Sequence, residues 1–303
     1  MAHEFTPAGP VDTTLVRADL HFPEGARIGP DGALYVSDVY AYRVLRIDLA
    51  TGQETTVAEV PGQPCGLGWL PDGRLLIVSM RDRMLLRLEP DGRLVVHADL
   101  GAVTAGAIND LFVDAAGRAW VSDFGFDYYG LIEADPDVDP LFGENANPPS
   151  AHLTLVEPDG TVRSAAGNLR FPNGVVVLDA GVVLVAETLG ARLTAFDIAP
   201  DGTLSGRRVW ADLSDAGPGG SPVAPDGLSI GPVGAVWVAD PGNGGAVLVA
   251  EGGAVRRRVQ ASQSCFSVAQ LPDGRVLCCT AATSKSDLAT AHAWGRLELG
   301  AAD

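Results

Sequence analysis

The sequence has few cysteines, and their spacing excludes a disulfide scaffold. Only 4 of the 303 residues are cysteine: Cys65, Cys265, Cys278 and Cys279. They form no C-x-x-C pair, and the adjacent Cys278 and Cys279 would point to opposite faces of a strand. We therefore expect free thiols, the usual state in a reducing compartment.

Basic residues are also scarce, because 21 Lys and Arg stand against 38 Asp and Glu, a net charge of -17. Phosphate backbones and anionic membranes would be repelled, so neither nucleic acid nor membrane is an expected partner. Residues 1–7 have no basic or apolar signal region, and no run approaches the ~18 apolar residues of a membrane span. We expect a cytoplasmic protein that binds a small molecule; its oligomeric state is left open.

Helical periodicity is nearly absent, and a β module recurs instead. Each module consists of a short apolar strand, a tight turn, a second apolar strand, a polar loop and a third strand. In the Pro-Asp-Gly turns, Pro fixes φ, Asp can accept backbone hydrogen bonds and Gly tolerates positive φ, so the turn closes a hairpin. The six turns lie at 30–32, 71–73, 114–117, 179–181, 231–234 and 272–274.

Six modules predict an all-β fold, a six-bladed β-propeller with four antiparallel strands per blade, forming one domain over residues 1–303. The segments between modules supply the fourth strands, except in the last module. Residues 14–18 are predicted to supply that missing strand and so close the ring. A two-sheet sandwich is the competing architecture, but it would not explain the regular repeat.

An insertion at about residues 124–150 separates the second and third strands of the third module. Loops of this length in compact folds are usually functional or disordered. We expect a lid that shapes a substrate pocket, the alternative being a surface excursion that does not contact the site.

Four polar side chains stand at the start of inner strands: Glu24, Asn109, Asn173 and Asp226. The first strand of each module lines the channel of a propeller, so these four residues should converge at its mouth. Each alone could be a turn or strand-end residue, but together they predict a metal site. Two carboxylates and two amide oxygens suit a hard cation such as Ca²⁺, and the lack of His and Cys disfavours Zn²⁺.

Three motifs carry a family resemblance: Phe171-Pro172-Asn173-Gly174, Asn109-Asp110 with the following Val113 to Arg118, and Asp226-Gly227-Leu228 with Val236 to Asp240. From about Glu24 to Thr280 the chain resembles the senescence marker protein/gluconolactonase (regucalcin-like) family. The resemblance implies a six-bladed propeller and a lactonase dependent on Ca²⁺, or in some members on Zn²⁺ or Mn²⁺. It implies Glu24, Asn173 and Asp226 as ligands and Asn109 at or beside the metal. Diisopropylfluorophosphatases use a similar Glu, Asn, Asn, Asp set.

The chain departs from that family at one position. Many sugar lactonases carry Arg two residues before the Asn-Asp pair, where this chain has Ala107. We therefore predict a substrate with fewer hydroxyl groups than an aldonolactone. The candidate substrate contacts are Ala107, Phe124, Tyr128, Glu187, Phe266 and Cys265. Cys265 as a nucleophile would need a base such as His152 or His292.

The expected chemistry is metal-assisted opening of a lactone, in which Asp226 accepts the proton of the attacking water. An esterase or phosphotriesterase on the same scaffold is one alternative. A binding module with a structural Ca²⁺ is another, and a strictosidine-synthase-like propeller is a more remote one. No G-x-S-x-G elbow or phosphate-binding loop is present, so serine-hydrolase and nucleotide-binding functions have no support.

Overall fold

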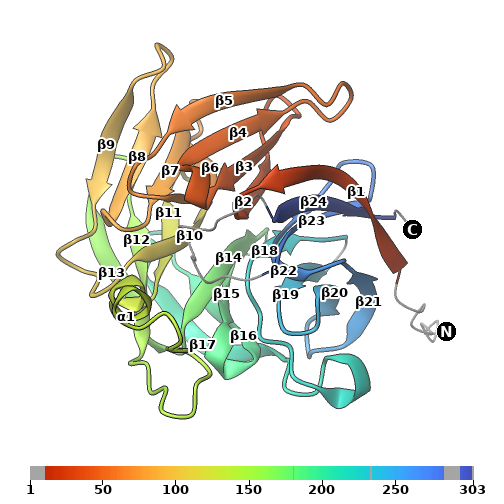
Figure 1. Ribbon diagram of the computed structural model, residues 1–303. Helices are drawn as coiled ribbons and strands as arrows, with labels where there is room; N and C mark the ends of the chain where they lie inside the picture. The colour runs from red at the N-terminus through yellow and green to blue at the C-terminus, as the bar shows by residue number, and fades with distance from the viewer. Residues whose placement is uncertain (1–10, 180, 233, 283–293, 302–303) are drawn as a thin grey trace.

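The computed structural model describes residues 11–179, 181–232, 234–282 and 294–301. Its sheets are arranged in a ring around a central axis, so the all-β, propeller-like prediction is confirmed (Figure 1). Four sheets have four strands each. They are β2 (Pro23–Ile28), β3 (Leu34–Asp38), β4 (Arg43–Ile47) and β5 (Glu54–Glu59); β6 (Pro64–Trp69), β7 (Leu75–Ser79), β8 (Met84–Leu88) and β9 (Leu94–Asp99); β10 (Ile108–Val113), β11 (Ala119–Asp123), β12 (Ala151–Val156) and β13 (Val162–Leu169); and β14 (Pro172–Leu178), β15 (Val182–Glu187), β16 (Arg192–Ile198) and β17 (Leu204–Asp212).

The remaining strands form one eight-stranded sheet. In spatial order it contains β18 (Leu228–Ile230), β19 (Ala235–Asp240), β20 (Gly245–Ala250), β21 (Val255–Gln260), β1 (Val11–Leu20), β24 (Gly295–Gly300), β23 (Val276–Ala281) and β22 (Ser264–Gln270). β1 pairs antiparallel with β24, so it supplies the strand predicted for residues 14–18. The first two residues of β1 also pair in parallel with β21. Six separate sheets are therefore not confirmed, because this parallel pairing joins two sets of four strands.

The predicted turns close the hairpins by the expected chemistry. Gly32 has φ +78° and donates its N–H to the Gly29 carbonyl at 2.9 Å. The Asp31 carboxylate accepts the Ala33 N–H at 3.2 Å. The Asp31 side chain thus accepts a backbone hydrogen bond in the turn, and Gly32 adopts the positive φ that most residues avoid.

The core lies between neighbouring sheets. Every residue of β7, β11, β19 and β23, the second strands of four modules, is buried. Such strands are mostly apolar on both faces, with polar residues only toward their ends, because a neighbouring sheet covers each face. This packing fixes the inner strands β2, β6, β10, β14, β18 and β22 around the axis.

The insertion joins β11 to β12 and carries a short helix, α1 (Tyr128–Ala134). Asp127 caps it by accepting the Gly130 N–H at 3.0 Å. The other helical segments of the described residues are 3-10 turns: η1 (Val39–Ala41), η2 (Thr188–Gly190) and η3 (Pro218–Gly220). Among the described residues, no helix has the length and hydropathy needed to cross a membrane.

Candidate functional site

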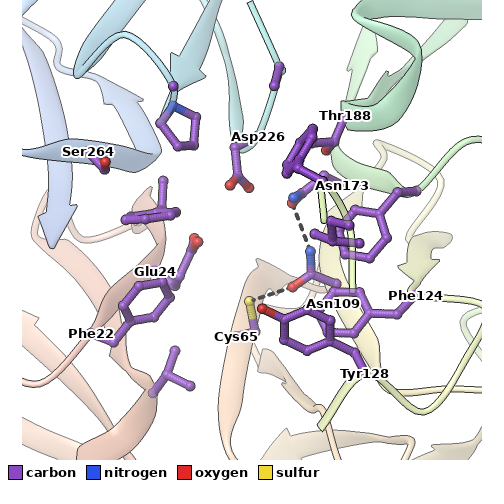
Figure 2. Close-up of a pocket in the computed structure, with 18 of the residues that line it drawn as sticks. Phe22, Glu24, Cys65, Asn109, Phe124, Tyr128, Asn173, Thr188, Asp226 and Ser264 are labelled. Atoms are coloured by element: carbon purple, nitrogen blue, oxygen red, sulfur yellow. Dashed lines mark hydrogen bonds between the residues drawn. The ribbon is translucent and has the colours of Figure 1, made fainter. Parts of the chain in front are cut away.

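The inner strands change register at the level of the predicted ligands. The pairing of β2, β10 and β14 with the next strand shifts around Glu24, Asn109 and Asn173, respectively. A bulge re-aims the side chain it contains, and bulges are common beside active sites. Here the three side chains turn toward one space, where Asp226 joins them from the segment before β18 (Figure 2).

Glycines beside the ligands let the inner strands approach each other closely. A Cβ on Gly25 would lie 2.2 Å from the carbonyl oxygen of Cys65 in the neighbouring sheet. A Cβ on Gly174 would lie 2.5 Å from the Leu228 nitrogen. The Gly174 N–H also donates to the Asp226 carbonyl at 3.2 Å. The ring of inner strands is therefore tight enough for side chains of different sheets to meet.

This tightness can be tested by replacing Gly25 with alanine. Gly25 and Gly32 both have positive φ, +59° and +78°, but nothing lies within 4 Å of a Cβ at Gly32. Both alanine variants should lose about 1–2 kcal/mol of unfolding free energy, because alanine must adopt the left-handed backbone conformation. Gly25→Ala should lose a further ~1–3 kcal/mol through overpacking. Urea unfolding of the two variants measures the difference, and equal losses would show that the strands can move apart freely.

The four predicted ligands line one cavity of about 670 Å³. The Asn109 amide donates through Nδ2 to Oδ1 of Asn173 at 2.8 Å, and its Oδ1 accepts from the Cys65 thiol at 3.3 Å. Figure 2 shows the carboxylates of Glu24 and Asp226 directed into the space beside these amides. The structure thus brings together four side chains that are up to 202 residues apart in sequence.

Both carboxylates are held in an environment that disfavours charge. Enclosure in the protein, and secondarily the charge of Asp110, raise the pKa of Glu24 to about 8. Burial, then Glu24 and then Asp110, raise the pKa of Asp226 well above its ordinary value. Arg27 does not relieve this repulsion fully, because it pairs with Asp110 at 3.3 Å and donates to the Leu111 carbonyl at 3.1 Å. Among the described residues, neither Glu24 nor Asp226 has a Lys, Arg or His partner within 4.0 Å.

The donor chemistry fits a hard divalent cation. Two buried carboxylates face the same cavity and are only partly compensated by Arg27, which is costly unless a cation binds them. An amide oxygen has two lone pairs, so Asn173 can accept from Asn109 and still bind a cation. Within the described ranges no group of three or more His, Cys, Asp and Glu is arranged to hold a metal. A cation here would therefore depend on the amide oxygens and on water, as Ca²⁺ sites often do.

Several aromatic side chains form part of the remaining cavity wall. The predicted contacts Phe124, Tyr128 and Phe266 line it. Sequence reasoning did not find Phe22 and Phe171, which also line it. The sequence could have indicated both residues, because each lies two positions before a predicted ligand. Ala107 was chosen as a substrate contact for the same spacing.

The insertion contributes five lining residues: Phe124, Tyr128, Tyr129, Leu141 and Phe142. Phe142 remains 62% exposed, so it lies at the edge of the cavity. A surface excursion without contact to the site is therefore excluded.

Three predicted substrate contacts lie outside the cavity lining. Ala107 is buried in the same hydrophobic cluster as Phe124, and its carbonyl accepts the Phe124 N–H at 2.9 Å. Cys265 points away because the register shift in β22 turns the next residue, Phe266, toward the cavity. Burial raises the pKa of the Cys265 thiol well above its ordinary value, which opposes a nucleophilic role. His292 lies outside the described residues.

Glu187 is the third residue placed elsewhere. Its carboxylate accepts from Arg192 Nε and Nη2, both at 3.0 Å, and from the Arg170 N–H at 2.8 Å. It also accepts from the Thr194 hydroxyl. These bonds fasten the end of β15 to β16 and to the segment before β14, so Glu187 joins strand ends and does not line the cavity.

The chain is similar to known proteins in both sequence and fold. Residues 22–283 match the family model described as the SMP-30/gluconolactonase/LRE-like region. Over 227 residues, 69% of each chain, the sequence is 25% identical to diisopropyl-fluorophosphatase of Loligo vulgaris. The structure is similar to a gluconolactonase of Xanthomonas campestris, with a TM-score of 0.69 and 20% identity over 97% of this chain and 98% of that one. It is also similar to the calcium-binding protein regucalcin of Agrobacterium tumefaciens, with a TM-score of 0.75 and 20% identity over 97% and 96%.

Proposed function

This chain belongs to the SMP-30/gluconolactonase/LRE-like family, which confirms the resemblance seen in its motifs, and we propose that it is a metal-dependent hydrolase that opens a lactone ring. The observation that supports this proposal most is the meeting of Glu24, Asn109, Asn173 and Asp226 in one cavity whose described lining residues include no basic side chain. We propose a small, neutral lactone with fewer hydroxyl groups than an aldonolactone as substrate.

The four residues would hold a divalent cation, most suitably Ca²⁺, with Zn²⁺ or Mn²⁺ as alternatives. When bound, such a cation polarises the carbonyl of the substrate and stabilises the negative charge that develops on its oxygen. The Gly25 N–H donates to Glu24 Oε2 at 3.1 Å and helps to fix that carboxylate.

Asp226 is the proposed proton acceptor. A water adds to the lactone carbonyl carbon and gives its proton to an Asp226 carboxylate oxygen. The bond between the carbonyl carbon and the ring oxygen then breaks, and the ring oxygen takes the proton from Asp226. The product is the open hydroxy acid, and Asp226 returns to its starting state.

Two structural features complete the proposal. We treat the eight-stranded sheet as two blades of a six-bladed propeller, because β18–β21 and β22–β24 with β1 each repeat the four-strand unit of the other sheets. We also propose that the insertion acts as a lid, since its aromatic residues already form part of the cavity wall.

Removal of the metal tests the function. Purified protein should contain a divalent cation by elemental analysis and should hydrolyse members of a panel of sugar, aliphatic and aromatic lactones. Dialysis against a chelator should reduce that hydrolysis more than about 100-fold, since the cation both orients the carbonyl and stabilises charge, and added Ca²⁺ should restore it.

The alternatives give different results in the same panel. The 25% identity to diisopropyl-fluorophosphatase favours phosphotriesters as the second substrate class, so they belong in the panel with metal-free controls. Turnover of phosphotriesters alone would favour that class. A chelator that lowers only the melting temperature, with no hydrolysis before or after, would identify a structural ion. Lactone hydrolysis that survives complete metal removal would contradict the proposal.

A further inference from the structure

The cavity has two aromatic walls. In the first wall, Phe22 packs against Tyr40 and Phe266, with ring centroids 5.3 and 4.9 Å apart. In the second wall, Phe124 and Phe171 are stacked, with centroids 4.9 Å apart and an interplanar angle of 16°. Figure 2 shows Phe22 on one side of the carboxylates, and Phe124 on the other.

The cavity disfavours an anionic substrate. Its described lining residues include no Lys, Arg or His, while Glu24 and Asp226 are acidic. The guanidinium of Arg27 donates to the Asp110 carboxylate and to backbone carbonyls of three inner strands, β2, β18 and β10. It therefore does not present its charge to the cavity. With one divalent cation bound, two carboxylates leave the site close to neutral, and a neutral substrate matches it best.

Several polar side chains of the wall are already engaged. The Thr188 hydroxyl donates to the Pro225 carbonyl at 2.7 Å. The Ser221 hydroxyl donates to Asn243 Oδ1 at 2.9 Å, and Asn243 Nδ2 donates to Asp240 at 2.8 Å. A sugar lactone would bury several hydroxyl groups against rings and engaged side chains, which costs binding energy for each unpaired group.

Phe171 is held in a costly conformation. It has φ +55°, a region that bulky residues rarely adopt. Backbone strain of this kind is concentrated at functional sites, where the surrounding structure maintains it. Here the strain places an aromatic ring in the cavity wall, two residues before the proposed ligand Asn173.

We propose that the site takes a neutral lactone or ester that carries a flat aromatic ring, with the ring between the two walls and the carbonyl toward Glu24 and Asp226. The reaction in this statement rests on the proposed function, whereas the binding of the ring does not. A cavity of about 670 Å³ lies within the ~300–1,000 Å³ typical of sites for drug-sized ligands, so it has room for a ring beyond the lactone. Offset and edge-to-face contacts with the walls would favour an aromatic over an aliphatic substrate.

Hydrolysis of matched substrates tests the preference. With Ca²⁺ present, kcat/KM for dihydrocoumarin, a benzene-fused δ-lactone, should exceed that for δ-valerolactone and for gluconolactone by about tenfold or more, given the free energy of aromatic contacts plus burial of the added ring. Phe171→Leu and Phe266→Leu should each lower kcat/KM for dihydrocoumarin about 3- to 10-fold, mainly through KM, and should lower kcat/KM for δ-valerolactone by a smaller factor. Phe196→Leu, which changes a buried ring on β16 outside the cavity, should alter neither substrate.

A binding measurement separates this inference from the proposed function. The lactam analogue of dihydrocoumarin resists hydrolysis, and δ-valerolactam is its aliphatic match. Calorimetry with Ca²⁺-loaded protein should show tighter binding of the aromatic lactam, weakened by Phe171→Leu but not by Phe196→Leu. Preferential binding of this lactam without hydrolysis of any lactone would support the aromatic site and contradict the proposed reaction. Lactone hydrolysis with equal affinity for both lactams, or with a preference for gluconolactone, would overturn the aromatic site and leave the reaction standing.

Discussion

Replacing Asp226 by asparagine is expected to reduce lactone turnover about 10²- to 10⁴-fold while a metal ion remains bound. Asp226 has a side-chain hydrogen bond with Asn173. Asparagine keeps an oxygen atom at the cavity and can keep this bond, but it cannot accept the proton of the attacking water. The loss should appear in kcat, because substrate binding depends mainly on the cavity walls. Steady-state kinetics on the best lactone of the panel, together with elemental analysis of the same sample, measure both quantities.

Asp114→Asn provides a matched control. Asp114 and Asp226 are both 8% exposed, but Asp114 lies at the opposite end of its inner strand and accepts from Arg118 Nε at 2.8 Å. Its replacement should lower stability without a comparable loss of turnover. An unchanged kcat in Asp226→Asn would show that Asp226 is not the base. Loss of the metal in this variant would show that Asp226 acts as a metal ligand and would give no support to its role as base.

Replacing Glu24 by glutamine is expected to weaken metal binding by at least about 100-fold, beyond the 10- to 100-fold typical of groups that only support a ligand. The variant loses one of the two formal negative charges and places a neutral amide in the cavity. Calorimetric titration with Ca²⁺ at pH 7 measures the change. Because the pKa of Glu24 is raised to about 8, much of the metal-free protein carries a proton on this residue at pH 7. Ca²⁺ binding to the unchanged protein should release that proton, and the glutamine variant should release fewer protons.

Whether Glu24→Gln is more or less stable than the unchanged protein should depend on whether the metal is present. The pKa of Glu24 is raised from 4.5 to about 8, so the folded protein binds more protons than the unfolded chain between these values. Metal-free protein should therefore lose stability as the pH rises from 4.5 through 8, and Glu24→Gln should remove part of that loss. With Ca²⁺ at pH 8 the order should reverse, the unchanged protein melting higher. Thermal unfolding with and without chelator measures both orders.

Glu298→Gln is the control for removing a glutamate from this fold. Its carboxylate accepts from the Ser262 N–H at 3.0 Å and from hydroxyl groups, which, against the effect of its burial, lower its pKa. That variant should lose stability with or without Ca²⁺ and should bind Ca²⁺ normally. If Glu24→Gln behaved in the same way, Glu24 would be a packing residue and the metal site would have to lie elsewhere.

The hairpin turns and the proposed metal ligands could be predicted from the sequence better than the residues of the cavity wall. The turn at 30–32 was predictable because Pro, Asp and Gly each satisfy a local backbone requirement, and Gly32 has the positive φ expected. The convergence of Glu24 and Asn173 was predictable because both occupy the same place in a repeat. Glu187 also ended a strand on the expected face, yet local bonds to Arg192 hold it away from the cavity.

The sequence by itself determined the strand pattern, the hairpin turns and the four oxygen donors, since these depend on periodicity and on local backbone chemistry. Only the tertiary structure decided that β1 bridges two sets of strands, that Phe266 and not Cys265 faces the cavity, and that Phe22 and Phe171 stand on opposite walls. The reason is geometric. A bulge that shifts the register of a strand changes which neighbouring side chain points inward, and the distance between two walls depends on how all the sheets pack around the axis.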